Sequence, residues 1–422
     1  MAPKCRAIAT GVDGDDRYIV ISADCHGGGN VLDYRPYLES RWHDAFDAWA
    51  ADYEVPYDDL TGDNGERNWD SARRQADLER DGVVAEVIFP NTVPPFFPKA
   101  SLTAQPPAVT TADAEQRWAG LQAHNRWLAD FCGSTPGRRA GVIQINLHDP
   151  DASATEIRRA VESGLTGGVL LPGTPPGLGL PQLFDECYEP IWRVCSELGV
   201  PVNHHTGSAA PPMGPTDVDA VVFLLEVSWW AHRALTHLIA GGVLERHPDL
   251  QLVFTEQGTA WVPDELMRLD YFFDRMGSAE GSQEAEWGRA VVGRLSLRPN
   301  EYWKRQCHVG ASFIRPAEVG MRALVGVDKI MWGSDYPHKE SSHPFSVEAL
   351  RAAFAGVPVD EVAEMVGGNA ARLYGFDLDV LRPVAAAWGP RVADVDRPLG
   401  DGDVPSAALK CPAFASLPVA AS

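Results

Sequence analysis

Cysteine is scarce in this chain, and its few copies are not arranged as in disulfide frameworks or zinc motifs. Seven cysteines are spread over 422 residues without a CxxC pair or a close, even spacing. This distribution argues against a disulfide framework and against a thiolate zinc site. Scattered thiols are typical of a protein in a reducing compartment, and we therefore expect a cytoplasmic protein.

Basic residues and long apolar runs are also in short supply. The chain has 36 Lys and Arg against 58 Asp and Glu, a net charge of −22, which repels nucleic acid and anionic lipid. The N-terminal residues MAPKCRAIATGVDGDD contain no apolar core of signal-peptide length. The longest apolar stretch, AVVFLLEVSWWAH, is short and contains Glu226, so it is not a membrane span. We expect neither a nucleic-acid partner nor a membrane partner.

Several common catalytic motifs are absent as well. The sequence has no GxSxG, Walker, GxGxxG or HExxH motif, which removes the commonest serine-hydrolase, nucleotide-binding and zincin alternatives. Its apolar fraction of 45% is normal for a globular protein with a sizeable core. A chain of this length forms one large barrel domain or two average domains.

Eight short apolar runs alternate with segments of helical character. The runs resemble buried strands and lie at 18–23, 83–90, 138–146, 167–173, 200–205, 250–256, 305–310 and 328–335. This alternating order predicts an α/β fold in which a parallel sheet closes as a (β/α)8 TIM-like barrel. A long insertion with one helix and a loop follows the first run.

The two ends of the chain fall outside this alternation. We expect a single barrel domain over 17–379, a flexible N-terminus over 1–16 and an extended C-terminal arm over 380–422. The last segment is rich in Pro, Ala and Ser. Disorder and wrapping around a neighbouring subunit fit that composition equally well.

Residues of the types that bind metals follow several of the runs directly. They are Asp24, His26, His204, His205, Glu256 and Asp335. In parallel barrels the chemistry takes place at the carboxyl ends of the strands. A chain that repeatedly delivers His and carboxylate side chains to one rim is predicted to build a metal site.

The spacing of these residues limits their roles. Asp24 and His26 are two residues apart, so their side chains share one face of a strand, although a polar loop edge would give the same pair. His204 and His205 are adjacent and face opposite sides, so at most one of them would bind the metal. Asp335 follows an apolar strand, and its burial must be offset by a metal, a His or an Arg.

Two further residues have more than one interpretation. Glu256 fits a metal ligand, a general acid or base, or a salt bridge at the start of a helix. His338, three residues after Asp335, fits a group that orients a ligand or meets the substrate, and it fits a plain turn residue equally well.

Aromatic residues cluster in the predicted loops at the rim. Phe96 and Phe97 lie in PPFFP, and Trp261 lies in GTAWVP. A pocket with these walls suits an apolar or ring-bearing substrate, and packing among the loops explains them equally well. Together with His204 they are candidate substrate-binding residues.

Between about residues 18 and 376 the chain contains, in this order, the segments ISADCH, DLERDGVVAEVIFPN, PVNHHTG, GGVLERHPDLQLVFTEQG, GSDYPH and GGNAARLYGF. Taken together, they resemble the amidohydrolase-related (amidohydrolase 2) branch of the amidohydrolase superfamily. The resemblance implies a (β/α)8 barrel that holds one or two divalent metals at the strand ends. It also implies a homodimer, because relatives commonly pair.

The resemblance assigns roles to individual positions. Asp24 and His26 match the ligand pair of the first strand, and His205, in its HxG context, matches the ligand of strand five. Asp335 matches the strand-eight aspartate, which binds metal and can take a proton from the bound water. Glu256 stands where many relatives have a His thought to act as acid or base.

Two departures from that pattern make the site more anionic. The first pair is Asp-x-His instead of His-x-His, and Glu256 replaces the His of strand six. The run at 167–173 also lacks the lysine that bridges two metals in some members of the superfamily, so a second ion would need Glu256 as an additional ligand. Zn²⁺ is the first expectation, and Fe or Mn also suits a set of His and carboxylate ligands.

These residues predict a metal-dependent hydrolase of an amide, ester, lactone or thioester, with metal-activated water as the nucleophile. Asp335, Glu256 and His338 are the candidate catalytic residues. The alternative is a metal-dependent non-oxidative decarboxylase of an aromatic or unsaturated carboxylic acid, an activity common in this branch. A metal-free barrel that only binds a ligand is a third hypothesis, and the full set of ligand types argues against it.

Overall fold

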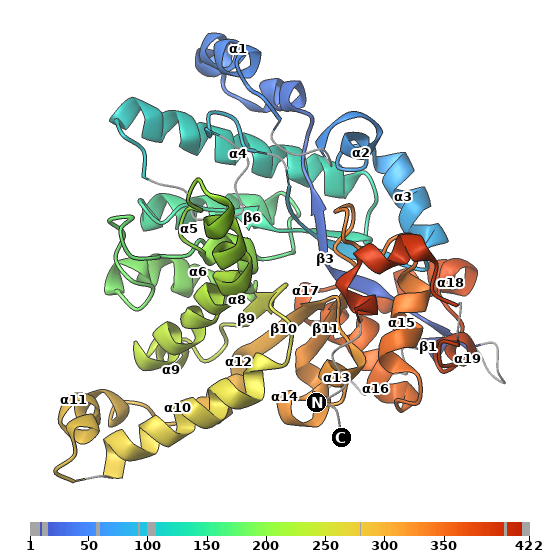
Figure 1. The fold of residues 1–422 in the computed structure, drawn as a ribbon. Coiled ribbons are helices and arrows are strands. Elements are labelled where there is room, and N and C mark those ends of the chain that lie inside the picture. The colour runs from blue at the N-terminus through green and yellow to red at the C-terminus, as the bar shows by residue number, and fades with distance from the viewer. Residues whose placement is uncertain are drawn as a thin grey trace.

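The fold is built on parallel strands surrounded by helices (Figure 1). The computed structural model describes residues 9–10, 16–55, 60–91, 93–98, 107–278, 280–400 and 403–415. Within these residues the parallel strands are β3 (Ile21–Gly27), β4 (Ala85–Pro90), β5 (Arg139–Gly141), β6 (Ile143–Gln144), β7 (Val169–Leu170), β8 (Val202–His205), β9 (Leu252–Thr255), β10 (Cys307–Ser312) and β11 (Ile330–Gly333). Strands β3 to β5 form one sheet and β6 to β11 form another, each in chain order.

Two seams join these sheets into a closed barrel. β5 and β6 are consecutive pieces of one strand, and Val142 between them donates its N–H to the carbonyl of Ile88 at 2.9 Å. At the other seam the end of β3 bonds to the chain that follows β11. There His26 N–H donates to Tyr336 O at 2.6 Å, and Asp335 N–H donates to Asp24 O at 2.8 Å. This closed parallel order confirms the predicted (β/α)8 barrel.

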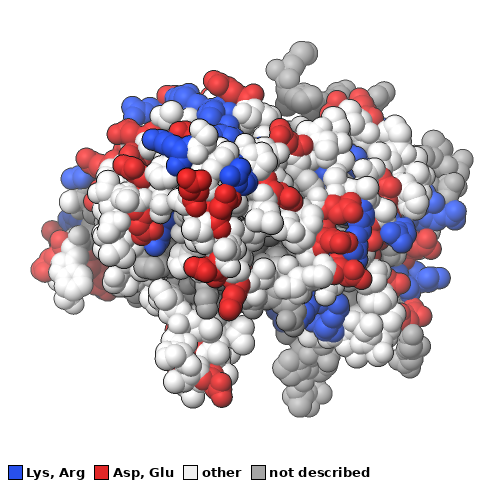
Figure 2. Space-filling view, turned by 90° about the horizontal axis from the view of Figure 1, so that it is seen from above, with Lys and Arg blue, Asp and Glu red and all other residues white. Residues whose placement is uncertain are grey.

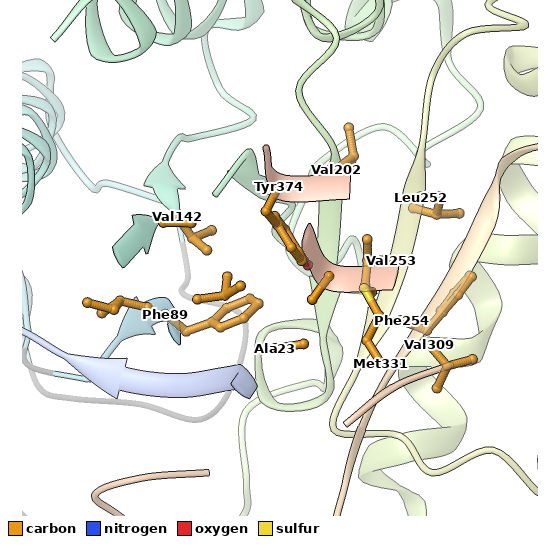
Figure 3. Close-up of a cluster of buried hydrophobic side chains, with 14 of the residues drawn as sticks. Ala23, Phe89, Val142, Val202, Leu252, Val253, Phe254, Val309, Met331 and Tyr374 are labelled. Atoms are coloured by element: carbon orange, nitrogen blue, oxygen red, sulfur yellow. The ribbon is translucent and has the colours of Figure 1, made fainter. Parts of the chain in front are cut away.

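Apolar side chains fill the space between the strands. The strands are covered on both faces, so they read as continuous apolar runs in the sequence. Figure 3 shows part of this core, with Phe89, Val142 and Val253 among the labelled side chains. Tyr374 enters it from α17 (Asn369–Tyr374) and donates its hydroxyl proton to Asn203 Oδ1 at 2.8 Å, so this polar group is paired despite complete burial.

The covering helices carry the start and stop signals expected from the sequence. Those between successive strands include α3 (Ser71–Arg80), α4 (Thr111–Gly133), α5 (Pro150–Glu162), α6 (Glu189–Leu198), α8 (Asp217–Ala240), α10 (Trp261–Ser278), α11 (Gln283–Val292) and α12 (Pro299–Gln306). Asp149 caps α5 by accepting the N–H of Ala152 at 2.9 Å, which satisfies one of the free donors of its first turn. Gly199 ends α6 with a φ of 65°, a left-handed conformation that glycine adopts without strain.

The segment between β3 and β4 is an insertion, with more helices than the one helix and loop that the sequence predicted. It contains η1 (Val31–Tyr37), η2 (Ser40–Trp42), α1 (His43–Ala51) and α2 (Gly62–Glu66), followed by α3. In Figure 1 the α1 end of this segment lies at the top of the molecule, away from α10 and α11. The described part of the N-terminus contributes a short antiparallel pair, β1 (Ala9–Thr10) with β2 (Arg17–Tyr18). Residues 1–8 and 11–15 lie outside the described residues.

The described part of the C-terminal segment is folded onto the barrel, in contrast to the extended arm that its composition suggested. It forms α18 (Leu378–Trp388), α19 (Val392–Val395), η7 (Ser406–Lys410) and η8 (Pro412–Phe414). Arg351 of α15 (Ser346–Phe354) donates to the carbonyls of Arg397 at 3.0 Å and Pro398 at 3.1 Å. Cys411 is 1% exposed in a small cluster with Ala349. Burial of apolar side chains along the segment favours this packed arrangement. Residues 401–402 and 416–422 lie outside the described residues.

In the part of the chain that the structure describes, no helix is long and apolar enough to cross a bilayer. On the face shown in Figure 2, acidic and basic side chains are interspersed, and the basic ones do not gather into a single patch.

Candidate metal centre

Four strands deliver polar side chains to one end of the barrel. Asp24 and His26 belong to β3, His205 is the last residue of β8, Glu256 directly follows β9, and Asp335 lies two residues beyond β11. These five residues are the ones that the sequence predicted as metal ligands. They come from the carboxyl ends of strands, where a parallel barrel presents its catalytic groups.

The functional atoms of these five residues meet in one cluster. His26 Nε2 lies 3.4 Å from Asp24 Oδ1 and 3.1 Å from Asp335 Oδ1. His205 Nε2 lies 3.7 Å from Asp24 Oδ1 and 3.4 Å from Glu256 Oε2. The imidazole rings of His26 and His205 stand edge to face with their centroids 5.1 Å apart. The structure therefore brings together two imidazoles and three carboxylates.

Four atoms of the cluster are buried and have no hydrogen-bond partner. They are Asp24 Oδ1, His26 Nε2, His205 Nε2 and Asp335 Oδ1. A buried polar atom without a partner carries a desolvation cost of about 1–3 kcal/mol, so four such atoms around His26 favour a shared partner. One nitrogen or oxygen from each of Asp24, His26 and His205 lies within 4.8 Å of the others, and the same holds for His26, Asp335 and His338. A divalent cation fits this set, because imidazole nitrogen and carboxylate oxygen are its usual protein ligands.

Charge also favours a cation at this place. Burial opposes ionisation of Asp24, but the imidazoles of His205 and His26 hold its pKa well below the ordinary value. Burial likewise opposes ionisation of Asp335, and His338 and His26 lower its pKa. Burial raises the pKa of Glu256 well above its ordinary value, and the nearby Asp335 and Asp24 raise it further. Three carboxylates share the site, and Glu256 is the one that takes up a proton most readily.

Backbone conformation aims two of the carboxylates. Glu256 and Asp335 have φ angles of 59° and 62°, in the left-handed region that residues other than glycine rarely adopt. In both cases the chain turns sharply at the end of a strand. Backbone strain of this kind persists where the surrounding structure fixes it, and it is concentrated at functional sites.

The two adjacent histidines of β8 point in different directions. His205 Nε2 joins the cluster, while His204 Nδ1 lies 3.1 Å from the carbonyl oxygen of Leu171 on the neighbouring chain segment. Burial lowers the pKa of His204 to about 4, so this ring is neutral at physiological pH. The carbonyl of His204 accepts a hydrogen bond from Gln257 Nε2 at 2.6 Å. His204 therefore lies behind the cluster and supports the end of β8.

His338 lies beside the cluster and is held from both sides. Its ring stacks on His26 with a centroid distance of 4.1 Å, and its Nδ1 lies 3.2 Å from Asp335 Oδ2. Its Nε2 lies 3.0 Å from Asn91 Oδ1, and Asn91 Nδ2 donates to Asn68 Oδ1 at 2.6 Å. This chain of contacts fixes the plane of the His338 ring against Asp335.

The sequence did not identify three residues that hold the cluster in place. Ser312 of β10 donates its hydroxyl proton to Asp24 Oδ2, which leaves Asp24 Oδ1 facing the other ligand atoms. Asn91 orients His338, and Arg74 donates to the carbonyl of His26 at 2.7 Å. A serine, an asparagine and an arginine at these positions carry no local signal, because their partners come from distant parts of the sequence.

The aromatic residues predicted to line the pocket pack elsewhere. Phe96 is 7% exposed and its ring contacts Trp42, Phe46 and Trp49 of the insertion. The guanidinium carbon of Arg117 lies 5.6 Å from the ring centroid of Phe97.

Trp261 stacks on His232 with a centroid distance of 3.9 Å and packs edge to face against Phe254 and Trp303. In the described residues, none of the ring contacts of Trp261, Phe96 or Phe97 involves the cluster, so their contact with substrate stays a prediction.

Comparison with known families places this barrel in a class. A family model described as amidohydrolase matches residues 69–376, and the chain belongs to this family. Among curated proteins it is 31% identical to a gamma-resorcylate decarboxylase of Rhodococcus jostii (strain RHA1), over 57% of this chain and 74% of that protein. It is 24% identical to the gamma-resorcylate decarboxylase of Rhizobium sp. (strain MTP-10005), over 52% of this chain and 66% of that relative.

Solved structures with the same fold include further decarboxylases. The 5-carboxyvanillate decarboxylase LigW of Sphingomonas paucimobilis superposes with a TM-score of 0.60 at 21% identity, covering 85% of this chain and 99% of that one. A dihydroxybenzoic acid decarboxylase of Polaromonas sp. JS666, with bound manganese and an inhibitor, superposes with a TM-score of 0.56 at 16% identity, covering 85% and 97%. At these identities the likeness establishes the fold.

These findings correct two expectations. The predicted hydrolase activity is wrong, because the curated relatives that the chain matches are decarboxylases, the alternative that the sequence left open. The physical reason is that the same cation can polarise the acyl group of a hydrolase substrate or the carboxylate of a decarboxylase substrate, so the ligand set does not separate the two reactions. A divalent metal is supported, but Zn²⁺ and Fe are not, since manganese is bound in neighbouring structures.

Proposed function

We propose that this protein is a metal-dependent, non-oxidative decarboxylase of a hydroxylated aromatic carboxylic acid. The observation that carries this proposal is the cluster of buried, unpaired ligand atoms in which Asp24 and Asp335 both face His26 Nε2 and His205 faces Asp24. The likeness to gamma-resorcylate and 5-carboxyvanillate decarboxylases supports the choice of reaction.

The four converging residues would hold the cation, and we propose Mn²⁺ as that cation. When bound, it supplies Lewis-acid polarisation and fixes the position of an anionic substrate. Ser312 and His338 keep the two carboxylates in place, because Ser312 donates to Asp24 Oδ2 and His338 Nδ1 contacts Asp335 Oδ2. A substrate carboxylate and a neighbouring ring oxygen would complete the set of donors.

Decarboxylation needs one proton at the ring carbon that carried the carboxyl group. The bond between the ring carbon and the carboxyl carbon breaks, carbon dioxide leaves, and the electron pair stays on the ring carbon until a proton joins it. We propose that Glu256 donates this proton from its carboxyl group. Two features support this role: Glu256 Oε2 lies 3.4 Å from His205 Nε2 at the edge of the cluster, and burial among other carboxylates favours its protonated form.

The test is a direct comparison of the two products. Metal-depleted protein reloaded with Mn²⁺ is incubated with 2,6-dihydroxybenzoate, 5-carboxyvanillate and other hydroxybenzoates, and with aryl esters and thioesters in parallel. We expect equal amounts of carbon dioxide and decarboxylated arene from at least one acid, and loss of this activity after chelation. Acyl hydrolysis without carbon dioxide release, or carbon dioxide release that survives stringent chelation, would refute the proposal.

We also propose that the chain forms a homodimer through α8. Val218, Val222, Leu225 and Trp229 are 70%, 43%, 79% and 57% exposed, and their spacing of four, three and four residues forms one apolar stripe. Exposed stripes of this kind mark protein contacts. Light scattering on the purified protein should give twice the chain mass, and Leu225→Asp should give the monomer. Leu324→Asp, at another largely exposed leucine on α14 (Arg322–Val325), is the control that should stay dimeric.

A further inference from the structure

Arg74 is a buried arginine beneath the candidate metal centre. It lies on α3, and none of its surface is exposed. Its Nη1 donates to the backbone carbonyl of His26 at 2.7 Å and to that of Arg67 at 3.0 Å. Its Nε and Nη2 bind Glu86 of β4 at 2.9 Å and 2.6 Å. The Arg74 side chain thus connects α3, β4 and His26, one of the predicted metal ligands.

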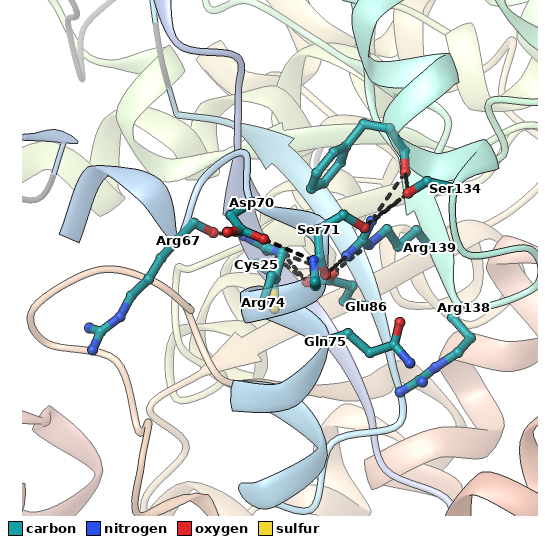
Figure 4. A network of polar contacts seen from close by, with 12 residues as sticks. Cys25, Arg67, Asp70, Ser71, Arg74, Gln75, Glu86, Ser134, Arg138 and Arg139 are labelled. Carbon is teal, nitrogen blue, oxygen red and sulfur yellow. Dashed lines mark hydrogen bonds and ion pairs between the residues drawn. The ribbon is translucent and has the colours of Figure 1, made fainter. Parts of the chain in front are cut away.

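Glu86 is shared between two arginines. Arg139 of β5 donates from Nε to Glu86 Oε1 at 3.1 Å. Figure 4 shows this network, with Arg74 and Arg139 on either side of Glu86 and Ser71 and Ser134 next to Arg139. Buried ion networks of this kind do not by themselves add stability over well-packed apolar side chains. A role in orientation would explain why such a costly group is placed here.

Arg74 also contacts the segment after β11, which carries another predicted ligand, Asp335. Its guanidinium carbon lies 4.9 Å from the ring centroid of Tyr336, the residue after Asp335. The Tyr336 hydroxyl donates to Asp77 Oδ2 on α3 at 3.0 Å, and the Tyr336 carbonyl accepts the N–H of His26. α3 therefore touches both sides of the seam at which β3 meets the chain that follows β11.

The seam is where the two ligand-bearing segments have to keep their spacing. β3 shifts register against β4 between Ser22 and Cys25, and β3 and β11 belong to different hydrogen-bonded sheets in the described residues. Two backbone hydrogen bonds cross this seam, from His26 N–H to Tyr336 O and from Asp335 N–H to Asp24 O, and His26 Nε2 lies 3.1 Å from Asp335 Oδ1. Contacts from α3 add to the constraint that these two bonds supply.

We propose that Arg74 is a positioning residue for the metal centre: it holds the His26 carbonyl and the Tyr336 ring so that His26 Nε2 and Asp335 Oδ1 face one cation. The inference rests on the proposed metal centre and adds a residue that does not touch the metal. Loss of a group that orients a ligand commonly weakens metal binding by about 10–100-fold. Arg139 bonds to the same Glu86 but does not contact a predicted ligand, so a variant of Arg139 is a matched control.

The experiment compares Arg74→Met, Arg74→Lys and Arg139→Met for Mn²⁺ affinity and thermal unfolding, with no substrate present. Free Mn²⁺ is counted by its electron paramagnetic resonance signal during titration of the metal-depleted protein. We expect Arg74→Met to raise the Kd for Mn²⁺ by about 10–100-fold and Arg139→Met to leave it within about twofold. Both should lower the unfolding temperature, because each leaves Glu86 with one partner fewer.

Arg74→Lys keeps the protein assayable if Arg74→Met does not fold. A lysine ammonium is a single point charge and cannot reproduce the bidentate geometry of a guanidinium. The lysine ammonium would pair with Glu86 and leave the His26 carbonyl without a hydrogen-bond donor. We therefore expect Arg74→Lys to bind Mn²⁺ more weakly as well. Wild-type Kd in a folded Arg74 variant, or equal weakening in Arg139→Met, overturns the inference. If the wild-type protein itself does not bind Mn²⁺, the proposed function fails instead, and the two failures are distinguishable.

Discussion

Replacement of Ser312 by alanine tests whether the orientation of Asp24 controls the metal centre. Ser312 is 5% exposed and Asp24 is fully buried. The serine hydroxyl donates to Asp24 Oδ2, while Asp24 Oδ1 faces His26 and His205 without a hydrogen bond of its own. Ser312→Ala removes this donor and leaves the backbone of β10 intact. The carboxylate then becomes free to rotate away from the other ligand atoms.

The expected size of the effect follows from the kind of bond that is lost. A hydrogen bond to a charged acceptor contributes about 1.5–3 kcal/mol. A change of about 1.4 kcal/mol in binding free energy corresponds to a factor of ten in Kd. If the lost hydrogen bond stabilised the metal-bound protein alone, the Kd for Mn²⁺ would rise roughly 10- to 100-fold. Part of the loss also falls on the metal-free protein, because the bond stabilises the Asp24 carboxylate there too. We therefore expect the Kd for Mn²⁺ to rise about tenfold.

Ser346→Ala provides a matched control. Ser346 is also fully buried and donates its hydroxyl proton to a buried carboxylate, Asp81 Oδ2, at 2.5 Å. That pair joins α15 to the end of α3 and contains none of the predicted ligands. In urea titrations, Ser346→Ala should lower the free energy of unfolding by an amount comparable to that of Ser312→Ala. Its Kd for Mn²⁺ should remain that of the wild-type protein. Wild-type Mn²⁺ affinity in Ser312→Ala, or the same weakening in Ser346→Ala, would refute the reasoning.

Three further substitutions test other parts of the molecule. Asp335→Asn should abolish turnover, by more than about 100-fold, with an unchanged circular dichroism spectrum; near wild-type turnover would remove Asp335 from the mechanism. Glu256→Gln should lower kcat about 10²–10⁴-fold and leave the Mn²⁺ stoichiometry as it is, whereas a lost ion would make Glu256 a ligand. Burial lowers the pKa of His124 to about 3, so the folded protein keeps this ring neutral while the unfolded chain binds a proton below pH 6.5. The free energy of unfolding therefore decreases as the pH falls from 6.5 towards 3, by about 2 kcal/mol at pH 5. Between pH 7.5 and 5, urea titrations of His124→Gln should show a decrease that is smaller by this amount than in the wild-type protein. An equal decrease in both proteins would contradict the assignment.

The barrel could be predicted because its strands are covered on both faces. Such strands must be apolar along their whole length, so LVFT of β9 and IMWG of β11 stand out without knowledge of their neighbours. The polar residue that ends each run stands out for the same reason. Asp24 and His26 could be paired from their spacing alone, since residues two apart on a strand share a face.

The supporting residues could not be found in this way, because closure of the barrel creates their contacts. Ser312 is 288 positions from Asp24, and Asn91 is 247 positions from His338. No local pattern marks either pair. Phe96 shows the opposite problem: an aromatic residue in a loop signals burial, but not whether its partner is a substrate or the ring of Trp42. Only the path of the insertion decides that question.

The choice between hydrolysis and decarboxylation depends on a single carboxyl group. A hydrolytic base must be ionised to take a proton from water, whereas a group that protonates carbon must hold a proton beforehand. Asp24 and Asp335 face imidazoles that favour their ionised forms, while Glu256 is partly buried beside two negative charges that oppose its own. A carboxyl group beside others of like charge has a raised pKa. Replacement of histidine by glutamate on strand six therefore need not remove the acid of a decarboxylase, because the surrounding carboxylates favour the protonated form that the reaction requires.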